Sequence, residues 1–357
     1  MGVAPGHLSS RFPALGAEEL ARRFHPPRRF GGARFDTFVP NPAHPSQALA
    51  VADLEDLVAE LASTAPHPRR RWGRRRAEAD RSAPGRYLDG GFGVGKTHLA
   101  AAAWHAAPPP KAYLTFAELT AVIGFLGMAS AVDAFSGYRL LCIDEFELDD
   151  VAHTLMTVTF LRSVVPAGVR VVATSNSLPD RLGEGRFSAD DFTREITSIA
   201  SWFEVVRIDG PDYRATVRPA TTRALADEEV DALLSSGGPA TDDRFAAVLH
   251  HLRRVHPVQY GPLVEGLDTV VVRDLAPIRD QNHALTWVAL VDELYDAEVS
   301  FGATGCAVGE LFDAGYRHGG YRKKYGRCES RMAAMLGEAA ARLAVASPLS
   351  PFGEASP

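Results

Sequence analysis

The sequence feature that most constrains the fold is a glycine-rich segment between a predicted strand and a predicted helix. Residues 90–97 read Gly-Gly-Phe-Gly-Val-Gly-Lys-Thr and match the pattern G-x-x-x-x-G-K-[ST]. We predict a strand over residues 86–88 and a helix that begins at Lys96 and stops before Pro108. Glycines allow successive backbone N–H groups to face one phosphate, and the amino end of a helix adds about half a positive charge there. The segment therefore predicts a phosphate-binding loop, with a simple glycine-rich turn as the alternative.

The side chains of this loop have distinct expected roles. We expect Lys96 to reach the β and γ phosphates of a nucleotide and the hydroxyl of Thr97 to ligate Mg²⁺. His98, on the first turn of the helix, either packs or forms a hydrogen bond on the phosphate side. The expected cofactors are therefore ATP and Mg²⁺. The residues predicted to contact the nucleotide are Gly90, Gly91, Phe92, Gly93, Val94, Gly95, Lys96, Thr97 and His98.

A second segment, residues 140–145, is an apolar strand that ends in two acids, Asp144 and Glu145. Asp144 follows Lys96 by 48 residues, which leaves room for the helix, strand and helix that bring a third strand beside the first. We expect Asp144 to hold Mg²⁺, largely through water, and Glu145 to polarise the attacking water. The acid pair favours hydrolysis of ATP over a small-molecule kinase, which more often needs an acceptor pocket and an arginine-rich lid.

A third buried strand, residues 171–175, is followed by Asn176, which could orient the water that Glu145 activates. The alternative is a turn asparagine before Ser177-Leu178-Pro179. Because parallel strands present their carboxyl ends at one edge of a sheet, the three polar clusters should share that edge. Together they predict an AAA+-type ATPase.

The alternation of strands and helices predicts an α/β fold, with a P-loop NTPase core of three layers around a parallel sheet and a smaller, mainly helical C-terminal lid domain. The length of 357 residues allows about two domains. We expect an N-terminal arm, a helix over 47–62 and a basic linker within residues 1–84, then the ATPase core over 85–218. The lid domain follows over 219–346, with a strand at 268–275 and a final helix at about 328–345, and a disordered tail over 347–357.

Composition excludes several classes. The shares of apolar (46%) and charged (23%) residues are ordinary, which argues against wholesale disorder, a coiled coil or a collagen-like repeat. No uninterrupted apolar run is long enough for a membrane-spanning helix, and the first 15 residues lack the pattern of a secretory signal. Three cysteines without a CxxC pair favour a reducing compartment, so we expect a cytoplasmic protein. The net charge is −6, yet six arginines lie within residues 69–76.

Several segments together make the sequence resemble the ZapE-like AAA+ ATPases, a family that includes a bacterial cell-division protein and mitochondrial relatives. The P-loop segments are shared widely among ATPases, whereas the others are more particular to this family. The segments are Pro26–Phe30, Tyr87–Thr97, Cys142–Phe146, Ala173–Asn176, Asp212–Arg214, Leu290–Asp296 and Ser330–Met332.

The resemblance implies that Arg331 is a sensor arginine on the lid, touching the nucleotide, whereas a solvated basic helix face shared with Arg327 is the alternative. It also implies an arginine finger that reaches a neighbouring subunit, but Ala189 stands where the family commonly has that arginine. We prefer Arg194 as the substitute, with Arg186 as the other candidate. A finger of this kind implies a homo-oligomer, for which a hexamer is the expected form.

Two functions from different classes remain open at this stage. The resemblance favours an ATP-driven remodeller of protein partners, among them division-ring components. The arginines of residues 69–76 would suit an ATP-dependent nucleic-acid loader instead. The negative net charge and the lack of a zinc-finger or helix-turn-helix signature make nucleic acid the weaker candidate. The sequence leaves open the protein substrate and whether a membrane surface recruits the complex.

Overall fold

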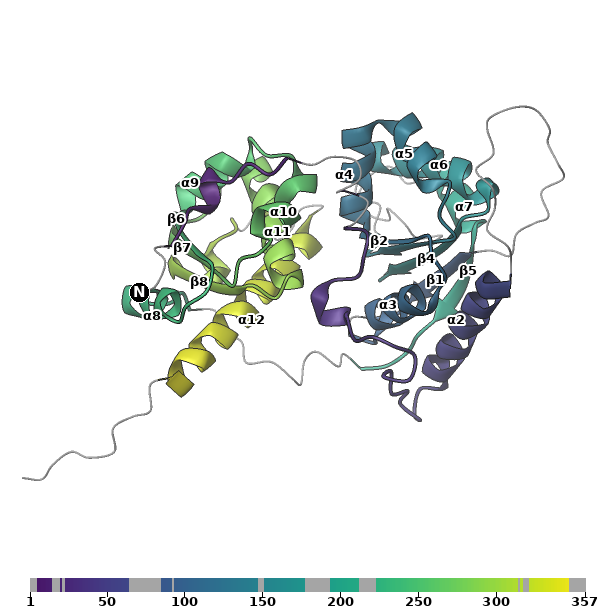
Figure 1. Cartoon of the computed structure of the whole chain (residues 1–357), viewed down its shortest axis with the longest axis horizontal. Helices are drawn as coiled ribbons and strands as arrows, with labels where there is room; N and C mark the ends of the chain where they lie inside the picture. Colours follow the sequence, from purple (N-terminus) through teal and green to yellow (C-terminus); the bar gives the residue numbers. More distant parts are fainter. Residues whose placement is uncertain are drawn as a thin grey trace, which may run out of the picture. The chain divides into compact units, whose positions relative to one another are not determined.

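The chain forms two compact units, residues 15–216 and residues 1–14 together with 217–357. The structure is a computed structural model, and it describes residues 5–14, 20, 23–63, 85–91, 93–146, 151–176, 193–211, 223–313, 315–316 and 321–346. Each unit has its own parallel sheet (Figure 1). The arginines of residues 69–76, the tail over 347–357 and the segment 212–214 lie outside the described residues.

The unit of residues 15–216 contains a five-stranded parallel sheet in the order β2-β3-β4-β1-β5. Strand β3, which lies between β2 and β4, is buried along its whole length, because helices cover both faces of the sheet. Figure 1 shows α2 and α3 on one face and α4 to α7 on the other. The predicted α/β fold with a parallel sheet is confirmed. The strands are β1 (Gly85–Asp89), β2 (Lys111–Thr115), β3 (Leu140–Asp144), β4 (Arg170–Ser175) and β5 (Phe203–Arg207).

Helices of this unit begin at signals that the sequence contains. The predicted helix over 47–62 is confirmed as α2 (Pro45–Ser63). Helix α4 begins with a capping box between Thr115 and Glu118. In α3, four consecutive alanines, residues 100–103, are fully buried, and their small side chains allow the helix to lie close to the sheet. The remaining bounds are α3 (Lys96–Ala106), α4 (Phe116–Leu126), α5 (Met128–Phe135), α6 (Val151–Val164) and α7 (Thr193–Ala200).

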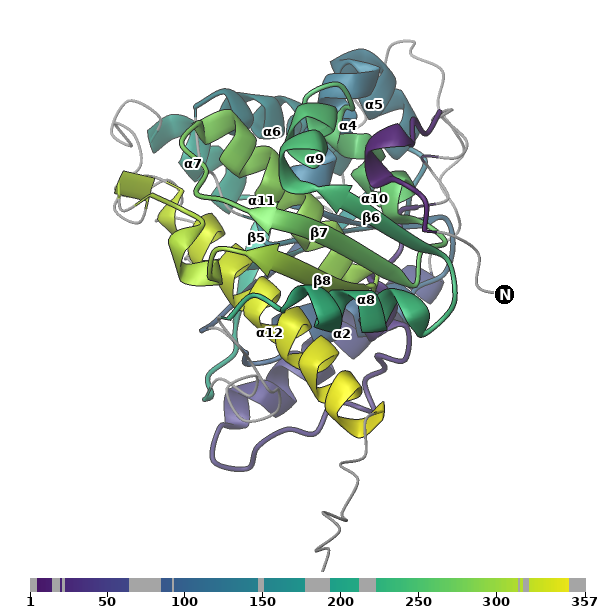
Figure 2. The ribbon, with the colours of Figure 1, turned by 90° about the vertical axis from the view of Figure 1, so that its left-hand side faces the viewer.

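The second unit contains a three-stranded parallel sheet in the order β6-β7-β8, and α12 packs against β8 (Figure 2). Helices predominate, as predicted, but of the strands only β7 was predicted. Strand β6 is short and mostly polar, and β8 contains two glycines, so neither carries a strong strand signal. The elements are α8 (Asp227–Ser235), β6 (Ala240–Arg244), α9 (Phe245–Leu252), α10 (Tyr260–Val264), β7 (Thr269–Leu275), α11 (Gln281–Asp296), β8 (Ser300–Gly305) and α12 (Arg322–Ala346).

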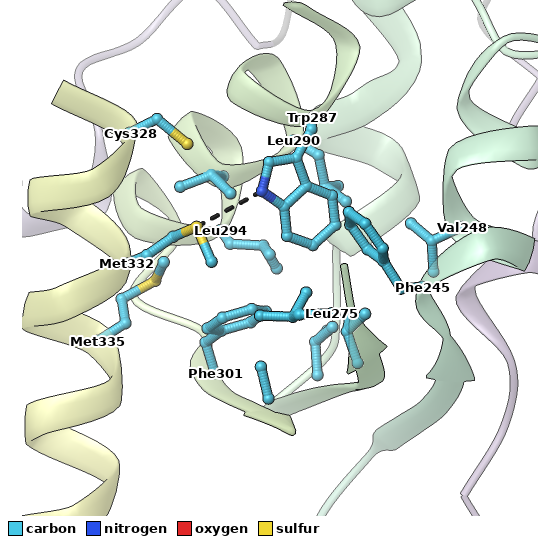
Figure 3. Packing of buried hydrophobic residues seen from close by; sticks show 14 of the residues in the cluster. Phe245, Val248, Leu275, Trp287, Leu290, Leu294, Phe301, Cys328, Met332 and Met335 are labelled. Carbon is cyan, nitrogen blue, oxygen red and sulfur yellow. Dashed lines mark hydrogen bonds between the residues drawn. The ribbon is translucent and has the colours of Figure 1, made fainter. Parts of the chain in front are cut away.

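The core of the second unit fixes α11 against α12. Trp287 of α11 is fully buried and donates a hydrogen bond from its indole Nε1 to Sδ of Met332 on α12, at 3.4 Å (Figure 3). The Trp287 ring also meets Phe245 edge to face, with 4.8 Å between ring centroids. These contacts set the positions of the polar side chains on the two helices.

The N-terminal residues extend this second unit, which the prediction of an extended arm did not include. Gly6 N donates to Ala240 O at 2.8 Å and Asp242 N donates to Gly6 O at 3.0 Å, so residue 6 continues the sheet beside β6 (Figure 2). Leu8, in the short 3-10 helix η1 (Leu8–Ser10), is buried in the core of the unit. The carboxylate of Asp243 accepts the backbone N–H groups of Leu8 and Ser9.

Candidate functional site

The glycine-rich loop lies between β1 and α3, as the sequence predicts. Gly95 is the N-cap of α3 and has a left-handed backbone with φ of 98°, a conformation that glycine adopts without steric cost. At Gly90 a side chain is excluded, because a Cβ atom would overlap the carbonyl oxygen of Ile208. The start of the loop therefore packs closely against the residue that follows β5. Of the predicted loop residues, Phe92 lies outside the described ones.

Lys96 lies inside the loop. Its ammonium donates to Gly90 O at 2.7 Å, to Gly91 O at 2.5 Å and to Asn176 Oδ1 at 2.9 Å. Only 8% of the residue is exposed. A buried ammonium is costly unless it is hydrogen-bonded, and these three acceptors hold the positive charge beneath the loop. The contact with Asn176 also brings together two predicted site residues, one at the start of α3 and the other directly after β4.

The carboxylate of Asp144 receives two hydroxyl groups. Thr97 Oγ1 donates to Asp144 Oδ1 at 3.2 Å, and Thr174 Oγ1 donates to the same oxygen. Asp144 is buried at the end of β3, and Thr174 lies near the end of the neighbouring β4. The predicted pair of Thr97 and Asp144 therefore does meet. No role for Thr174 is predicted from the sequence. The register of β3 and β4, which pairs Ile143 with Ala173, places Thr174 beside Asp144.

The chain turns sharply after Asp144. Glu145 has a positive φ of 54°, which is strained for a residue with a side chain. Its N–H donates to Thr174 Oγ1 at 3.0 Å, and Phe146 N donates to Thr174 O at 2.7 Å. The Phe146 ring is fully buried and packs edge to face with Tyr87. Two hydrogen bonds to one threonine and a buried ring therefore fix the backbone of Glu145 at the edge of the sheet.

His98 connects α3 to the N-terminal segment. Its Nε2 lies 3.1 Å from Thr37 Oγ1 and 3.1 Å from Arg34 O, and its ring lies 5.7 Å from that of Phe38. His98 therefore contacts residues 34–38, and a hydrogen bond from it on the phosphate side stays a prediction. The same Phe38 ring covers Gly95, where a Cβ atom would overlap it.

The two predicted arginines lie on different units. Arg194 is exposed on α7 of the unit that carries the loop, whereas Arg186 and Ala189 lie outside the described residues. The role of Arg194 as an arginine finger stays a prediction. Arg331 is on α12 of the other unit, where 8% of it is exposed and Nη1 donates to Asp292 Oδ1 at 2.6 Å. The structure therefore gives Arg331 a carboxylate partner that the sequence reasoning did not assign.

Two aspartates, one beside Lys96 and one beside Arg331, have shifted pKa values. Burial raises the pKa of Asp89, at the end of β1, although the charge of Lys96 opposes the shift. Burial also acts to raise the pKa of Asp292, but the guanidinium groups of Arg327 and Arg331 outweigh it and hold that pKa below its usual value. Asp292 is therefore a carboxylate at neutral pH, and it carries the charge that the two arginines require.

A family model described as AFG1-like ATPase matches residues 37–236 and 232–342. The chain belongs to the AFG1-like ATPase family. This confirms the family resemblance that the sequence motifs indicate, and it supports an ATPase of the AAA+ type. The match includes both the loop and α11, so the family's shared sequence extends over both compact units.

Individual relatives agree with this family. The chain is 31% identical over 190 residues to the cell division protein ZapE of Escherichia coli K12, and equally so to that of strain O157:H7. These alignments cover 47% of this chain and 51% of each relative, so the chain spans about half the length of the curated relatives it matches.

Similarities to solved structures concern the fold alone. The DnaC helicase loader is 18% identical with a TM-score of 0.37, and the match covers 51% of this chain and 99% of that one. DnaI is 20% identical with a TM-score of 0.41, and the match covers 52% and 93%.

Among the described residues, no single helix has both the length and the apolar character needed to cross a membrane; the pair α4 and α5, bent by 119°, meets that criterion only when its two helices are combined.

Proposed function

We propose that the chain binds ATP with Mg²⁺ and hydrolyses it to ADP and phosphate. The observation that carries the proposal is the Lys96 ammonium, held under the loop by two loop carbonyls. Phosphate oxygens are better acceptors for an ammonium than peptide carbonyls, so a nucleotide would take over part of this hydrogen bonding. The backbone N–H groups of the loop and the amino end of α3 would add to the attraction for the phosphates.

The residues beside the loop fit a magnesium ion. Thr97 and Asp144 supply a hydroxyl and a carboxylate oxygen, which are hard donors of the kind that Mg²⁺ takes. The ion would keep several waters, in line with the prediction that Asp144 acts largely through water. Bound there, Mg²⁺ would neutralise charge on the β and γ phosphates.

Glu145 and Asn176 complete the proposed chemistry. Glu145 would accept a proton from a water as the water oxygen bonds to the γ phosphorus and the bond to the β–γ bridging oxygen breaks. Its strained backbone and the two hydrogen bonds to Thr174 support a fixed orientation for this task. Asn176, which holds Lys96 through Oδ1, would help to orient the same water.

The wider assignment rests on the family. We propose a homo-oligomer, hexameric as an AAA+ ring, in which Arg194 reaches a neighbouring nucleotide site and ATP turnover remodels a protein partner. The relatives named cell division protein ZapE support division-apparatus components as that partner. The free cysteines Cys142, Cys306 and Cys328 support a cytoplasmic setting, since a reducing compartment keeps thiols unpaired.

Phosphate release and binding of a fluorescent ATP analogue test the proposed reaction. We expect Lys96→Ala to lose nucleotide binding, and Glu145→Gln to bind ATP but to stop hydrolysis. Lys111→Ala is the matched control, because its ammonium also donates to two backbone carbonyls, at 2.9 and 2.8 Å, but from the opposite end of the strands. Hydrolysis at the normal rate by Glu145→Gln would refute its role as the base.

The partner class needs a separate experiment. Glu145→Gln, held with ATP and compared with Lys96→Ala, should retain protein partners in a pull-down from cells. The nucleic-acid alternative predicts binding to DNA that falls steeply with salt and disappears when the arginines of residues 69–76 are neutralised. Stimulation of the ATPase by DNA, and not by retained proteins, would replace the remodelling proposal.

A further inference from the structure

Residues 6–13 dock on the second unit along their whole length, and we call this segment the N-terminal clasp. Figure 2 shows it in purple beside β6 and α9. Gly6 bridges to β6 at one end, and at the other end Pro13 O accepts a hydrogen bond from Gln259 Nε2 at 2.6 Å. Between them, Asp243 of β6 accepts two backbone N–H groups of the segment. The clasp is therefore held by hydrogen bonds at both ends and in the middle.

The second half of the clasp is held by Arg11 and by a histidine of α9. The Arg11 guanidinium donates to Leu263 O at 2.6 Å and to Glu265 O at 2.9 Å. The carbonyl oxygen of Arg11 lies 2.8 Å from Nε2 of His251. The His251 ring also meets the ring of Phe12 edge to face, with 4.7 Å between centroids. One histidine of α9 therefore contacts two consecutive residues of the clasp.

The contact with Arg11 fixes which nitrogen of His251 carries the proton. A carbonyl oxygen can only accept a hydrogen bond, so Nε2 must be the donor. In the neutral ring, Nδ1 then carries a lone pair and no hydrogen. His251 is only 2% exposed, and its Nδ1 is buried with no hydrogen-bond partner among the described residues. The docked clasp therefore suits a neutral His251.

A second proton on His251 would go to Nδ1. It would create a buried N–H without an acceptor and place a positive charge where little water reaches it, and both are unfavourable. Burial accordingly lowers the pKa of His251, and the charges of Arg254 and His250 on α9 add to the shift. The hydrogen bond to Arg11 O and the charge of Asp243 act in the opposite direction but do not outweigh it.

The clasp itself contains one other titratable group, His7. Its Nδ1 lies 2.8 Å from Asp242 O and 3.8 Å from Asp243 Oδ1. A second proton on His7 would attract Asp243 and so favour docking in acid. However, 66% of the His7 side chain is exposed, so water screens this attraction. His251, which is buried, should therefore decide how docking responds to pH.

We propose that residues 6–13 form a pH-sensitive clasp, fastened to the second unit while His251 is neutral and released when His251 takes up a proton. Release would free the edge of β6 that Gly6 covers and would empty the place of Leu8 in the core. A free strand edge is a surface with which another chain can pair. The clasp and its contacts lie wholly within this unit, so its release does not depend on the proposed ATPase function.

Hydrogen exchange of the full chain, corrected for the intrinsic effect of pH on exchange, measures the release. Because docking lowers the pKa of His251, a released clasp takes up the proton first. Docking is therefore strongest above the ordinary value of 6.5 and weakens as the pH falls below it. Between pH 7.5 and pH 5.5 we expect the opening constant at the amides of Gly6 and Leu8 to rise about three- to tenfold. Amides of β7 should keep their protection.

Two variants assign the effect to a residue. His251→Gln keeps a side-chain N–H that can donate to Arg11 O but cannot take up a proton, so the clasp should stay docked and lose its pH dependence. The matched control is His250→Gln, which changes an exposed histidine on the same helix and should keep the full pH dependence.

A titration of the His251 ring by NMR gives a reciprocal measurement. In Leu8→Ala, where the clasp is loosened, the midpoint should move up toward the ordinary 6.5, because the released ring reaches water. Three results would each overturn the proposal. They are constant protection of Gly6 and Leu8 from pH 7.5 to pH 5.5, an undiminished pH dependence in His251→Gln, and an unchanged midpoint in Leu8→Ala.

Discussion

Thr174 offers the sharpest test of how the site is built, because its hydroxyl acts in two directions. It donates to Asp144 and accepts from the backbone N–H of Glu145 at 3.0 Å. Replacing Thr174 with Val keeps the shape of the side chain and removes both bonds. A hydrogen bond to a charged group contributes about 1.5–3 kcal/mol, and depriving a buried donor of its acceptor costs about 1–3 kcal/mol.

Since two bonds through one atom are not independent, we expect Thr174→Val to lower the free energy of unfolding by about 2–4 kcal/mol. For a unit of the size of residues 15–216, this corresponds to a fall in melting temperature of about 5–15 °C. Asp144 also loses one of the two hydroxyls that orient it. The Mg²⁺ concentration that half-saturates ATPase activity should therefore rise.

Differential scanning calorimetry and a magnesium titration of ATPase activity measure the two effects. Thr157→Val is the matched control, because Thr157 is fully buried in the same unit but donates only to a helix carbonyl, His153 O, at 2.7 Å. That loss should be small. If Thr174→Val melts within about 2 °C of Thr157→Val and keeps the normal magnesium dependence, the assigned role of Thr174 is wrong.

Three further substitutions test the loop, the N-terminal residues and the contacts of Asp292. Gly90→Ala should lose ATP-analogue binding, because its Cβ would displace either the loop or Ile208; unchanged affinity would contradict that reading. Leu8→Ala should destabilise the C-terminal unit by about 2–5 kcal/mol, seen as faster hydrogen exchange in β6 and β7 but not in β1. The pKa of Asp292 is held below its ordinary 3.8, so its stabilising charge is present above that pH and is lost as the pH falls below it. Asp292→Asn should therefore flatten the acid side of the stability curve, and an unchanged acid limb would argue against a charged Asp292.

The place of the glycine-rich loop in the fold could be predicted from the sequence because its parts are local. A strand, a glycine loop and a helix follow one another over about 20 residues, and the helix does begin at Lys96. Asp144 lies beside Thr97 because β3 ends at the same edge of the parallel sheet as β1, from which the loop leads into α3. The contact of Thr174 with Asp144 could not be predicted, because it depends on the register between β3 and β4, which no short sequence pattern specifies.

The C-terminal unit was harder to predict because its contacts are long-range. Strands β6 and β8 have weak local signals, and they form because they pair with the apolar β7 and are covered by helices. The contact between Asp292 and Arg331 joins residues 39 apart on two helices. Helical spacing places Arg327 and Arg331 on one face of α12, but it does not say whether water or a carboxylate meets that face.

The docking of the N-terminal residues has a consequence for the order in which the chain folds during synthesis. Leu8 binds Asp243 across 235 residues of sequence. At about 5–20 residues per second, the ribosome needs roughly 10–50 s to make that stretch. The unit of residues 15–216 can be completed within this interval, while Leu8 still has no core to enter. A chain that stalls after residue 216 would therefore expose Leu8 although the unit of residues 15–216 has folded, and chaperones and proteases could distinguish it from a completed chain.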